Sequence, residues 1–312
     1  MKLSSVISRY VFHKQSLGYR YATEVAILRS FNKMVGNKQI ENIDAIAVMA
    51  FISGKGPITE NWVKKYRVLS GFYRYALTRR LVRSSPLPRN VPNPTVLGFI
   101  PYIYSHEELK RLLNAIPAAC ANRTPIEEDV LRVFILLLYS TGLRLGEALA
   151  LTLSDLDLNQ AYLHIHKTKF FKSRLVPLGK DLNTLLTEHV FRRNKCHNTA
   201  IDAPLFCFRD GSPLSQSAIG NAFRRMRKYA EIWREGGARR QPRLHDLRHT
   251  AAVHRLISWY QSGANLQDML PKLATYLGHV DLSSTQRYLT MTPELLDLAS
   301  RRFEHYALGD RS

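Results

Sequence analysis

Four short segments of the chain carry side chains suited to one task, the handling of a phosphodiester. The first reads TGLRLGE, and Arg144 in it follows a glycine turn directly after an apolar run. A guanidinium held at such a place could grip two phosphate oxygens at once. An ordinary surface pair with Glu147, one helical turn further on, would explain this segment equally well.

The second segment reads RLHDLRHT and contains a histidine and an arginine three residues apart. If the segment is helical, His245 and Arg248 share one face. A neutral imidazole beside an arginine offers a proton acceptor next to an anion clamp. The structural alternative is a basic helix start that contacts phosphate passively.

The third segment joins a histidine to a tyrosine. Gly278 can end one helix in a left-handed turn, which leaves His279 in the connection. Ser283 and Gln286 form a capping-box pattern, so Tyr288 is expected early in the next helix. A tyrosine hydroxyl, with a pKa of about 10, is a poor nucleophile unless cations and a base activate it. Most of the 15 tyrosines must be structural, so this residue alone decides nothing.

The fourth segment, KTKFFKSRLVPL, is a predicted β-hairpin between strands at 162–167 and 174–178. Its turn holds Lys167, Lys169 and Lys172. A lysine on such a turn could hand a proton to a departing alkoxide. A solvated turn would explain any one of these lysines as well.

Taken together and in this order, the segments resemble the signature of the tyrosine recombinases, also called the phage-integrase family. The resemblance covers residues 101–305 and rests on six positions: Arg144, Lys169, His245, Arg248, His279 and Tyr288. Lys169 is placed by counting back from the RLVPL strand, and Lys167 is the alternative. The long stretch before the last motif is similar to members carried by transposons and plasmids.

The resemblance implies a site-specific DNA recombinase that acts through a 3′-phosphotyrosine intermediate and a Holliday junction. Tyr288 would be the nucleophile, and Arg144, Arg248 and His279 would bind the scissile phosphate. His245 would be the general base or help to position the tyrosine, and Lys169 would protonate the 5′-oxygen. Neither a metal nor another cofactor is expected. Two alternatives stay open: a type IB topoisomerase or telomere resolvase with the same chemistry, and a non-catalytic DNA-binding protein of the same fold.

The composition indicates a polyanionic partner, most simply double-stranded DNA with specific recombination sites. The 312 residues include 45 Lys+Arg against 25 Asp+Glu, a formal net charge of +20. Residues 1–100 hold 16 of these basic residues and only 4 of the acidic ones. With 45% hydrophobic residues the chain can bury a full core, which excludes a disordered basic tail.

A proline-rich stretch divides the chain, because prolines at 86, 88, 92, 94 and 101 cannot lie inside a helix. We therefore predict an N-terminal helical DNA-binding domain at 1–83, a linker at 84–101 and a catalytic domain at 102–312. A helix over 60–81, capped by Thr59, places an apolar stripe opposite a cationic face. The DNA contacts expected on that face are Lys64, Lys65, Arg67, Arg74, Arg79 and Arg80.

The second domain is predicted to be mainly α with one small β-element. Helices are expected from Ser105 and over 127–140, 215–233, 244–259, 268–277, 284–289 and 293–305. The predicted fold class is thus mainly α with a small β-sheet or hairpin. In terms of the resemblance, this is a SAM-like core-binding domain followed by an α+β tyrosine-recombinase catalytic domain.

The last predicted helix carries an apolar stripe that needs a partner. The resemblance implies that this helix docks on a neighbouring protomer in a tetramer on DNA, with accessory recombinases or DNA-bending proteins as further partners. Packing of the helix on its own core is the alternative. Three cysteines imply no disulfide framework, and no apolar run approaches the roughly 20 residues that span a bilayer. We therefore expect a cytoplasmic bacterial protein, associated with the nucleoid when bound to DNA and without a membrane partner.

Overall fold

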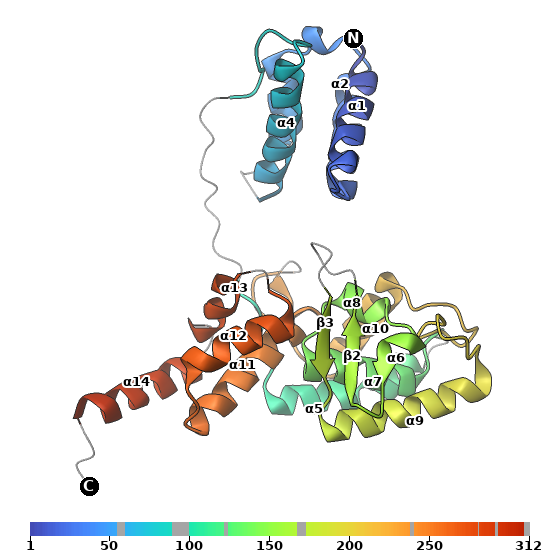
Figure 1. Cartoon of the computed structure of the whole chain (residues 1–312), viewed down its shortest axis with the longest axis vertical. Helices are drawn as coiled ribbons and strands as arrows, with labels where there is room; N and C mark the ends of the chain where they lie inside the picture. The colour runs from blue at the N-terminus through green and yellow to red at the C-terminus, as the bar shows by residue number, and fades with distance from the viewer. Residues whose placement is uncertain are drawn as a thin grey trace. The chain divides into compact units, whose positions relative to one another are not determined.

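The chain forms two compact units, Met1–Phe99 and Ile100–Ser312 (Figure 1). A computed structural model describes residues 1–54, 60–88, 100–121, 124–166, 173–237, 240–279, 281–290 and 293–308. The boundary between the units falls in the proline-rich stretch at 84–101, of which residues 89–99 lie outside the described residues.

The first unit is helical throughout its described part. Its elements are α1 (Leu3–Ser16), α2 (Ala22–Val35), the 3-10 turn η1 (Ile40–Asn42), α3 (Ala45–Ser53) and α4 (Glu60–Thr78). Helix α4 packs against α1, α2 and α3 and buries Trp62, Leu69 and Phe72 in their common core. The helix predicted over 60–81 is therefore present but ends at Thr78. Its predicted cap, Thr59, lies outside the described residues.

The second unit combines helices with one small sheet. Its first helices are α5 (His106–Asn114), α6 (Ile116–Cys120), α7 (Glu128–Thr141), α8 (Leu145–Leu149), α9 (Lys180–Cys196) and α10 (Gln216–Tyr229). The later elements are α11 (Asp246–Gln261), α12 (Leu266–Leu277), α13 (Ser283–Gln286), the 3-10 turn η4 (Arg287–Thr290) and α14 (Pro293–Leu308). The predicted helices are found with ends that shift by a few residues, except that the one expected over 284–289 is the single turn α13 followed by η4.

The sheet has the strands β1 (Leu156–Asp157), β2 (Tyr162–Ile165) and β3 (Arg174–Pro177), in that order and all antiparallel. The hairpin predicted from the sequence is formed by β2 and β3, with Leu163 opposite Val176. The short strand β1 follows the 3-10 turn η2 (Leu153–Asp155) and was not predicted. The fold class, mainly α with a small β-sheet, is confirmed.

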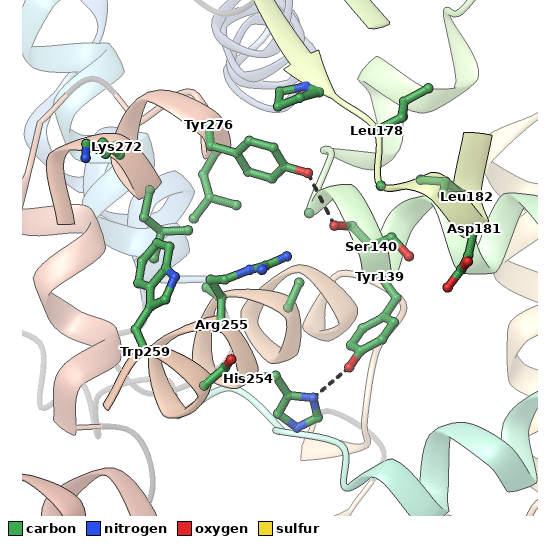
Figure 2. A pocket seen from close by; sticks show the side chains of 18 of the residues that line it. Tyr139, Ser140, Leu178, Asp181, Leu182, His254, Arg255, Trp259, Lys272 and Tyr276 are labelled. Atoms are coloured by element: carbon green, nitrogen blue, oxygen red, sulfur yellow. Dashed lines mark hydrogen bonds between the residues drawn. The ribbon is translucent and has the colours of Figure 1, made fainter. Parts of the chain in front are cut away.

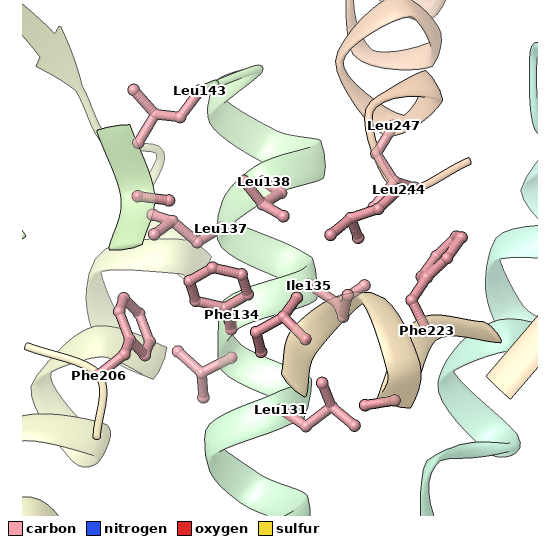
Figure 3. Packing of buried hydrophobic residues seen from close by; sticks show 14 of the residues in the cluster. Leu131, Phe134, Ile135, Leu137, Leu138, Leu143, Phe206, Phe223, Leu244 and Leu247 are labelled. Atoms are coloured by element: carbon pink, nitrogen blue, oxygen red, sulfur yellow. The ribbon is translucent and has the colours of Figure 1, made fainter. Parts of the chain in front are cut away.

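Helix α7 lies at the centre of the second unit's core. Phe134, Leu137 and Leu138 project from it between side chains of α10, α11 and the loop after α9 (Figure 3). These side chains are almost fully removed from water. The central position of α7 matters for the site because its C-terminal end, Thr141-Gly142, leads straight into Arg144.

Local sequence signals explain two of the helix ends that surround the site. At the start of α5, the Ser105 hydroxyl accepts the Glu108 N–H and the Glu108 carboxylate accepts the Ser105 N–H, so the predicted capping box is confirmed. At the end of α7, Gly142 adopts φ 60°, a left-handed conformation that favours glycine. A Cβ atom on Gly142 would lie 2.6 Å from Leu277 Cδ2, so this close approach also requires glycine.

The capping box predicted at Ser283 and Gln286 is wrong. Ser283 already lies inside α13, and the Asp281 carboxylate accepts the backbone N–H of Ser284 at 2.9 Å. Asp281 also accepts from the hydroxyls of both serines. An ionised carboxylate is a stronger acceptor than a hydroxyl, and the helix starts at Ser283, one residue earlier than predicted. Tyr288 consequently lies in the 3-10 turn η4 that follows.

Candidate active site

The turn that ends α12 is held by three arginines from three different elements. The last carbonyls of a helix have no hydrogen-bond partner within the helix, and here these are the consecutive carbonyls of Tyr276, Leu277 and Gly278. Arg174 Nε donates to the first at 3.1 Å, Arg248 Nη2 to the second at 2.7 Å and Arg144 Nη2 to the third at 2.8 Å. The predicted phosphate-binding arginines, Arg144 and Arg248, therefore bond the two residues that precede His279.

Arg144 is fixed by its own helix start. It is the N-terminal cap of α8, and its backbone N–H donates to Glu147 Oε2 at 3.0 Å while Nη1 donates to Oε1 at 2.8 Å. The pair predicted from the sequence thus forms, together with a bond to Gly278. The Arg144 side chain stays 33% exposed, so the guanidinium keeps an open side on which an anion could bind.

Arg248 is the buried counterpart of Arg144, with 4% exposure. Its Nη1 donates to the Gly142 carbonyl at 2.6 Å, in addition to the Leu277 bond. Burial, followed by the charge of Arg144, lowers its pKa to about 10, which still leaves it protonated at neutral pH. The site therefore holds two fixed positive charges.

Glu147 supplies a buried negative charge that pairs with Arg144 and Arg174. Its carboxylate accepts from Arg174 Nη2 at 2.7 Å and Nη1 at 3.2 Å, and both side chains are 9% exposed. Burial alone would raise its pKa, but the bonds and charges of Arg174 and Arg144 outweigh burial and lower the pKa to about 2. Glu147 is thus ionised at every physiological pH.

Tyr288 lies against this arginine cluster with only 2% exposure. Its hydroxyl is 3.2 Å from His249 Nδ1, and its ring stacks on His279 with ring centres 6.0 Å apart. Burial raises the pKa of the hydroxyl, while the positive charge of the neighbouring Arg248 acts in the opposite direction. The tyrosine is therefore protonated at rest, next to the groups that could stabilise its ionised form.

Two histidines, His249 and His279, contact the tyrosine and a third, His245, adjoins His249; each has a lowered pKa. Burial and the charges of Arg248 and Arg144 lower the pKa of His279 to about 4, and its Nδ1 lies 2.7 Å from the Thr285 hydroxyl. Burial and the neighbouring His245 lower the pKa of His249 to about 4. Both rings are therefore neutral at pH 7.

His245 stands at the outer edge of this group and is exposed. Partial removal from water, together with the charges of Arg248 and Arg243, lowers its pKa. Its ring lies perpendicular to that of His249, with centres 5.1 Å apart. The first neighbour of the Tyr288 hydroxyl is thus His249, whereas the sequence pattern singled out His245.

Five of the six predicted site residues are brought together here, and the sixth lies outside the described residues. Lys169 and its alternative Lys167 both belong to the undescribed segment 167–172 between β2 and β3. Sequence reasoning missed His249 and Arg174. His249 could have been found from the RHT run, because it adjoins Arg248, whereas no local signal distinguished Arg174 from other surface cations.

The cations predicted on the helix over 60–81 do not all face solvent. Lys64, Arg67, Arg74, Arg79 and Arg80 are exposed. Lys65 instead donates from Nζ to the Phe51 carbonyl at 2.6 Å, and the same nitrogen lies 4.4 Å above the Phe51 ring. Lys65 therefore ties α4 to α3, because its amphipathic side chain satisfies the end of that helix.

The described residues contain no three His, Cys, Asp or Glu side chains placed to hold a metal ion. Among the helices that the structure describes, none is long and apolar enough to cross a membrane.

The chain is similar to known proteins over most of its length. Residues 103–294 match the family described as "Phage integrase family". The putative integrase/recombinase y4rE of Sinorhizobium fredii is 35% identical over 308 residues, which cover 96% of this chain and 95% of that protein. The tyrosine recombinase XerC of Syntrophus aciditrophicus is 28% identical over 267 residues, covering 81% and 77% of the two chains.

Solved structures share the fold at low identity. The lambda integrase(75–356) dimer bound to a COC′ core site has a TM-score of 0.68 at 18% identity, covering 94% of this chain and 97% of that one. The Tn1549 transposon integrase in complex with transposon right end DNA has a TM-score of 0.69 at 18% identity, covering 98% and 100%. The arrangement of helices around the small sheet is therefore shared with both.

Proposed function

The chain belongs to the phage integrase family, the tyrosine recombinases, and we propose that this site-specific DNA recombinase acts through a 3′-phosphotyrosine intermediate on Tyr288. One observation carries the proposal: Arg144 and Arg248 hold the turn that bears His279, directly beside the tyrosine. Fixed positive charges next to a hydroxyl suit a phosphodiester, whose negative charge grows in the transition state.

The proposed chemistry is a pair of transesterifications. The Tyr288 oxygen attacks the scissile phosphorus, the bond from phosphorus to the 5′-oxygen breaks, and the 3′-phosphate stays on the tyrosine. The 5′-hydroxyl of a second strand then attacks the same phosphorus and releases the tyrosine, which yields a Holliday junction after one exchange. Each step replaces one phosphate ester by another, so the bond energy is retained and no ATP is consumed.

Proton movement in this scheme falls to the histidines and to the hairpin. The proton of the Tyr288 hydroxyl leaves toward His249, 3.2 Å away, and the exposed His245 beside it. At pH 7 His249 is a neutral imidazole that can accept a hydrogen bond from the hydroxyl, and a phosphate anion bound nearby would raise its low pKa toward the range of a general base. We assign protonation of the 5′-oxygen to Lys169, by the resemblance alone.

Burial of Tyr288 adds a condition to this scheme. With 2% exposure, the hydroxyl is not open to a phosphate on a duplex surface. The segment that carries it, α13 and η4, consists of two single turns that follow residue 280, which lies outside the described residues. We propose that this segment shifts when DNA binds, so that the tyrosine reaches the phosphate held by Arg144.

The nucleophile is tested by trapping the covalent complex. Nicked suicide duplexes made from the DNA that flanks this gene would be incubated with the wild-type protein and with Tyr288→Phe, and adducts would be resolved on denaturing gels. We expect an adduct only with the wild type, and mapping by mass spectrometry should place the nucleotide on Tyr288. Tyr276→Phe is the matched control, because this tyrosine bonds the Ser140 carbonyl from the same unit. An adduct on Tyr288→Phe would refute the assignment.

The two alternative activities predict different products from the same assay. Rapid relaxation of a supercoiled plasmid without any element-derived site would favour a topoisomerase, and hairpin ends would favour a telomere resolvase. Binding without any adduct would favour a non-catalytic DNA-binding protein. The relatives named above are integrases and recombinases, which supports strand exchange between two sites.

We also propose that α14 docks on a second copy of this chain. Leu295 is fully buried in the helix's own unit, but the adjacent Leu296 is 51% exposed and α14 extends outward from the α11–α12 layer (Figure 1). Its exposed face carries Glu294 and Asp297. An apolar residue flanked by acidic ones suits a basic groove with apolar walls.

The second unit has such a groove, of about 780 Å³, between α7, α11, α12 and the start of α9. Arg255 points into it between Trp259 and Tyr139, and Lys272 lies at its rim (Figure 2). We assign this groove as the receptor for α14 of a neighbouring protomer.

Disulfide trapping between two differently tagged copies tests the docking on DNA. One copy would carry Leu296→Cys and the other Ser258→Cys, both with the exposed Cys196 replaced by serine. We expect a mixed disulfide between the two tags. A control copy with Ile201→Cys, an exposed apolar position outside the groove, should give none. Equal trapping at both positions would contradict the assignment.

A further inference from the structure

Arg174, the first residue of β3, uses all three of its guanidinium nitrogens on other parts of the protein. Nη2 and Nη1 donate to the two carboxylate oxygens of Glu147, and Nε donates to the Tyr276 carbonyl. The side chain is 9% exposed. Because each guanidinium nitrogen already donates to the protein and the side chain is buried, Arg174 is not placed to bind a phosphate itself.

Glu147 links Arg174 to the phosphate-binding Arg144. Oε1 accepts from Arg144 Nη1 and Arg174 Nη1, and Oε2 accepts from the Arg144 backbone N–H and Arg174 Nη2. Each carboxylate oxygen is therefore shared between the two arginines. If Arg174 were displaced, the Glu147 carboxylate would lose two of its hydrogen bonds and become free to move. Because that carboxylate fixes the direction of Arg144, the Arg144 guanidinium would move with it.

The same guanidinium also supports the turn that bears His279. Arg174 holds the Tyr276 carbonyl, two residues before the carbonyl that Arg144 holds at Gly278. A Cβ atom on Gly278 would lie 2.6 Å from Arg174 Nη1 and 2.8 Å from Cζ. The turn and the guanidinium are thus in direct contact, and glycine is required for that approach as well as for the φ of 70°.

We propose that Arg174 is a positioning residue of the recombinase: it couples the β2–β3 hairpin to Arg144, through Glu147, and to the His279 turn. The inference rests on the proposed function, because it assigns the cluster a role in aligning the scissile phosphate. Arg174 lies two residues after the segment 167–172, which contains the predicted lysines. Strand β3 and the arginine that would receive the phosphate are therefore joined through one side chain.

The expected consequence is a loss of rate without a loss of DNA affinity. Reacting groups displaced by about 1 Å can cost on the order of 100-fold in rate. We expect Arg174→Met to cleave suicide duplexes about 100-fold more slowly than the wild type while binding the same DNA within about twofold. Arg174→Lys keeps the charge but cannot form the two-pronged bond to Glu147, so it should restore little of the rate.

Arg193→Met is the matched control, because Arg193 is also a buried arginine in the second unit. It donates to the carbonyls of Pro204 and Asn198, away from the site. This variant should lose stability but cleave at close to the wild-type rate. If it loses cleavage as strongly as Arg174→Met at matched folded fraction, Arg174 has only a structural role.

A chemically altered substrate separates positioning from general loss of structure. A methylphosphonate at the scissile position removes the negative charge that Arg144 must neutralise. If Arg174 acts through Arg144, the defect of Arg174→Met should shrink at least tenfold on this substrate, whereas a misfolded fraction would lower both rates equally. An undiminished defect overturns the proposed route through Arg144.

A double-mutant cycle with Glu147→Gln provides the second test. Residues that act as one unit have non-additive effects. Glu147→Gln/Arg174→Met should therefore cleave about as slowly as either single variant, and multiplied defects would refute a common route. If the wild type forms no adduct on Tyr288, the proposed function fails. If it does and Arg174→Met matches its rate, only this inference fails.

Discussion

Replacing Glu147 by glutamine should destabilise the second unit by an amount that depends on pH. The pKa of this carboxyl falls from 4.5 to about 2, because the bonds to Arg174 and Arg144 outweigh burial. A fall of that size corresponds to about 3 kcal/mol of unfolding free energy at pH 7. Glutamine keeps the shape but loses the charge, so Glu147→Gln should be less stable than the wild type by at least this amount.

The sign of the pH dependence follows from the direction of the shift. A carboxyl with a lowered folded pKa stabilises the protein fully above its unfolded pKa, here 4.5, and loses this contribution as the pH falls through about 2. At pH 3 less than half of the contribution is left. The gap between wild type and Glu147→Gln should therefore narrow by about 2 kcal/mol between pH 7 and pH 3.

The assay is urea unfolding of the full chain at both pH values, followed by hydrogen exchange in peptides of α7. Those peptides report the second unit, because α7 lies in its core. Glu107→Gln is the control: this carboxylate pairs with Lys110 on the surface and should give no measurable gap. A gap for Glu147→Gln that stays the same at pH 7 and pH 3 would refute the assigned charge network.

Three further predictions address the histidines, the turn and the first unit. In NMR titrations of the free protein, the ring signals of His249 and His279 should titrate with midpoints of about pH 4, because the pKa values of both rings are lowered to about 4. A titration midpoint near 6.5, the ordinary value for histidine, would contradict this. Gly278→Ala should slow suicide-substrate cleavage at least tenfold with DNA affinity retained, because its Cβ would displace the Arg174 guanidinium; wild-type cleavage would show that the turn tolerates it. Replacing Lys64, Arg67 and Arg74 together by glutamine should make the slope of log affinity against log salt less negative by about 0.9 for each lost phosphate contact, measured by fluorescence anisotropy. Lys65→Gln should instead lower the stability of the first unit and leave that slope unchanged, because Lys65 bonds the Phe51 carbonyl.

Local signals in the chain were sufficient where a neighbouring residue decides the geometry. The capping box at Ser105 and the left-handed turn at Gly142 each depend on a few adjacent residues, and both are present. The predicted capping box at Ser283 failed because two local acceptors competed, and the carboxylate of Asp281 prevailed over the hydroxyl. The strand β1 was missed because it has two residues, too few for an alternating pattern.

The order and types of the site residues were readable from the chain, but their contacts were not. Arg174 and Glu147 are 27 positions apart, and Arg144 and Gly278 are 134 positions apart. No periodicity records such pairs, because they form only when α8, β3 and α12 pack together. For the same reason His249, and not His245, turned out to be the neighbour of the Tyr288 hydroxyl.

The chemistry was readable from the residues alone: two arginines, a tyrosine and several histidines in an order typical of one family, within a chain whose charge indicates a polyanionic partner. The tertiary structure alone decided how these groups are supported. Three consecutive carbonyls at the end of α12 need donors once that helix end is buried, and three arginines from separate elements supply them. Bonding that joins distant elements depends on packing, so one of those arginines, Arg174, could be recognised only after the chain was folded.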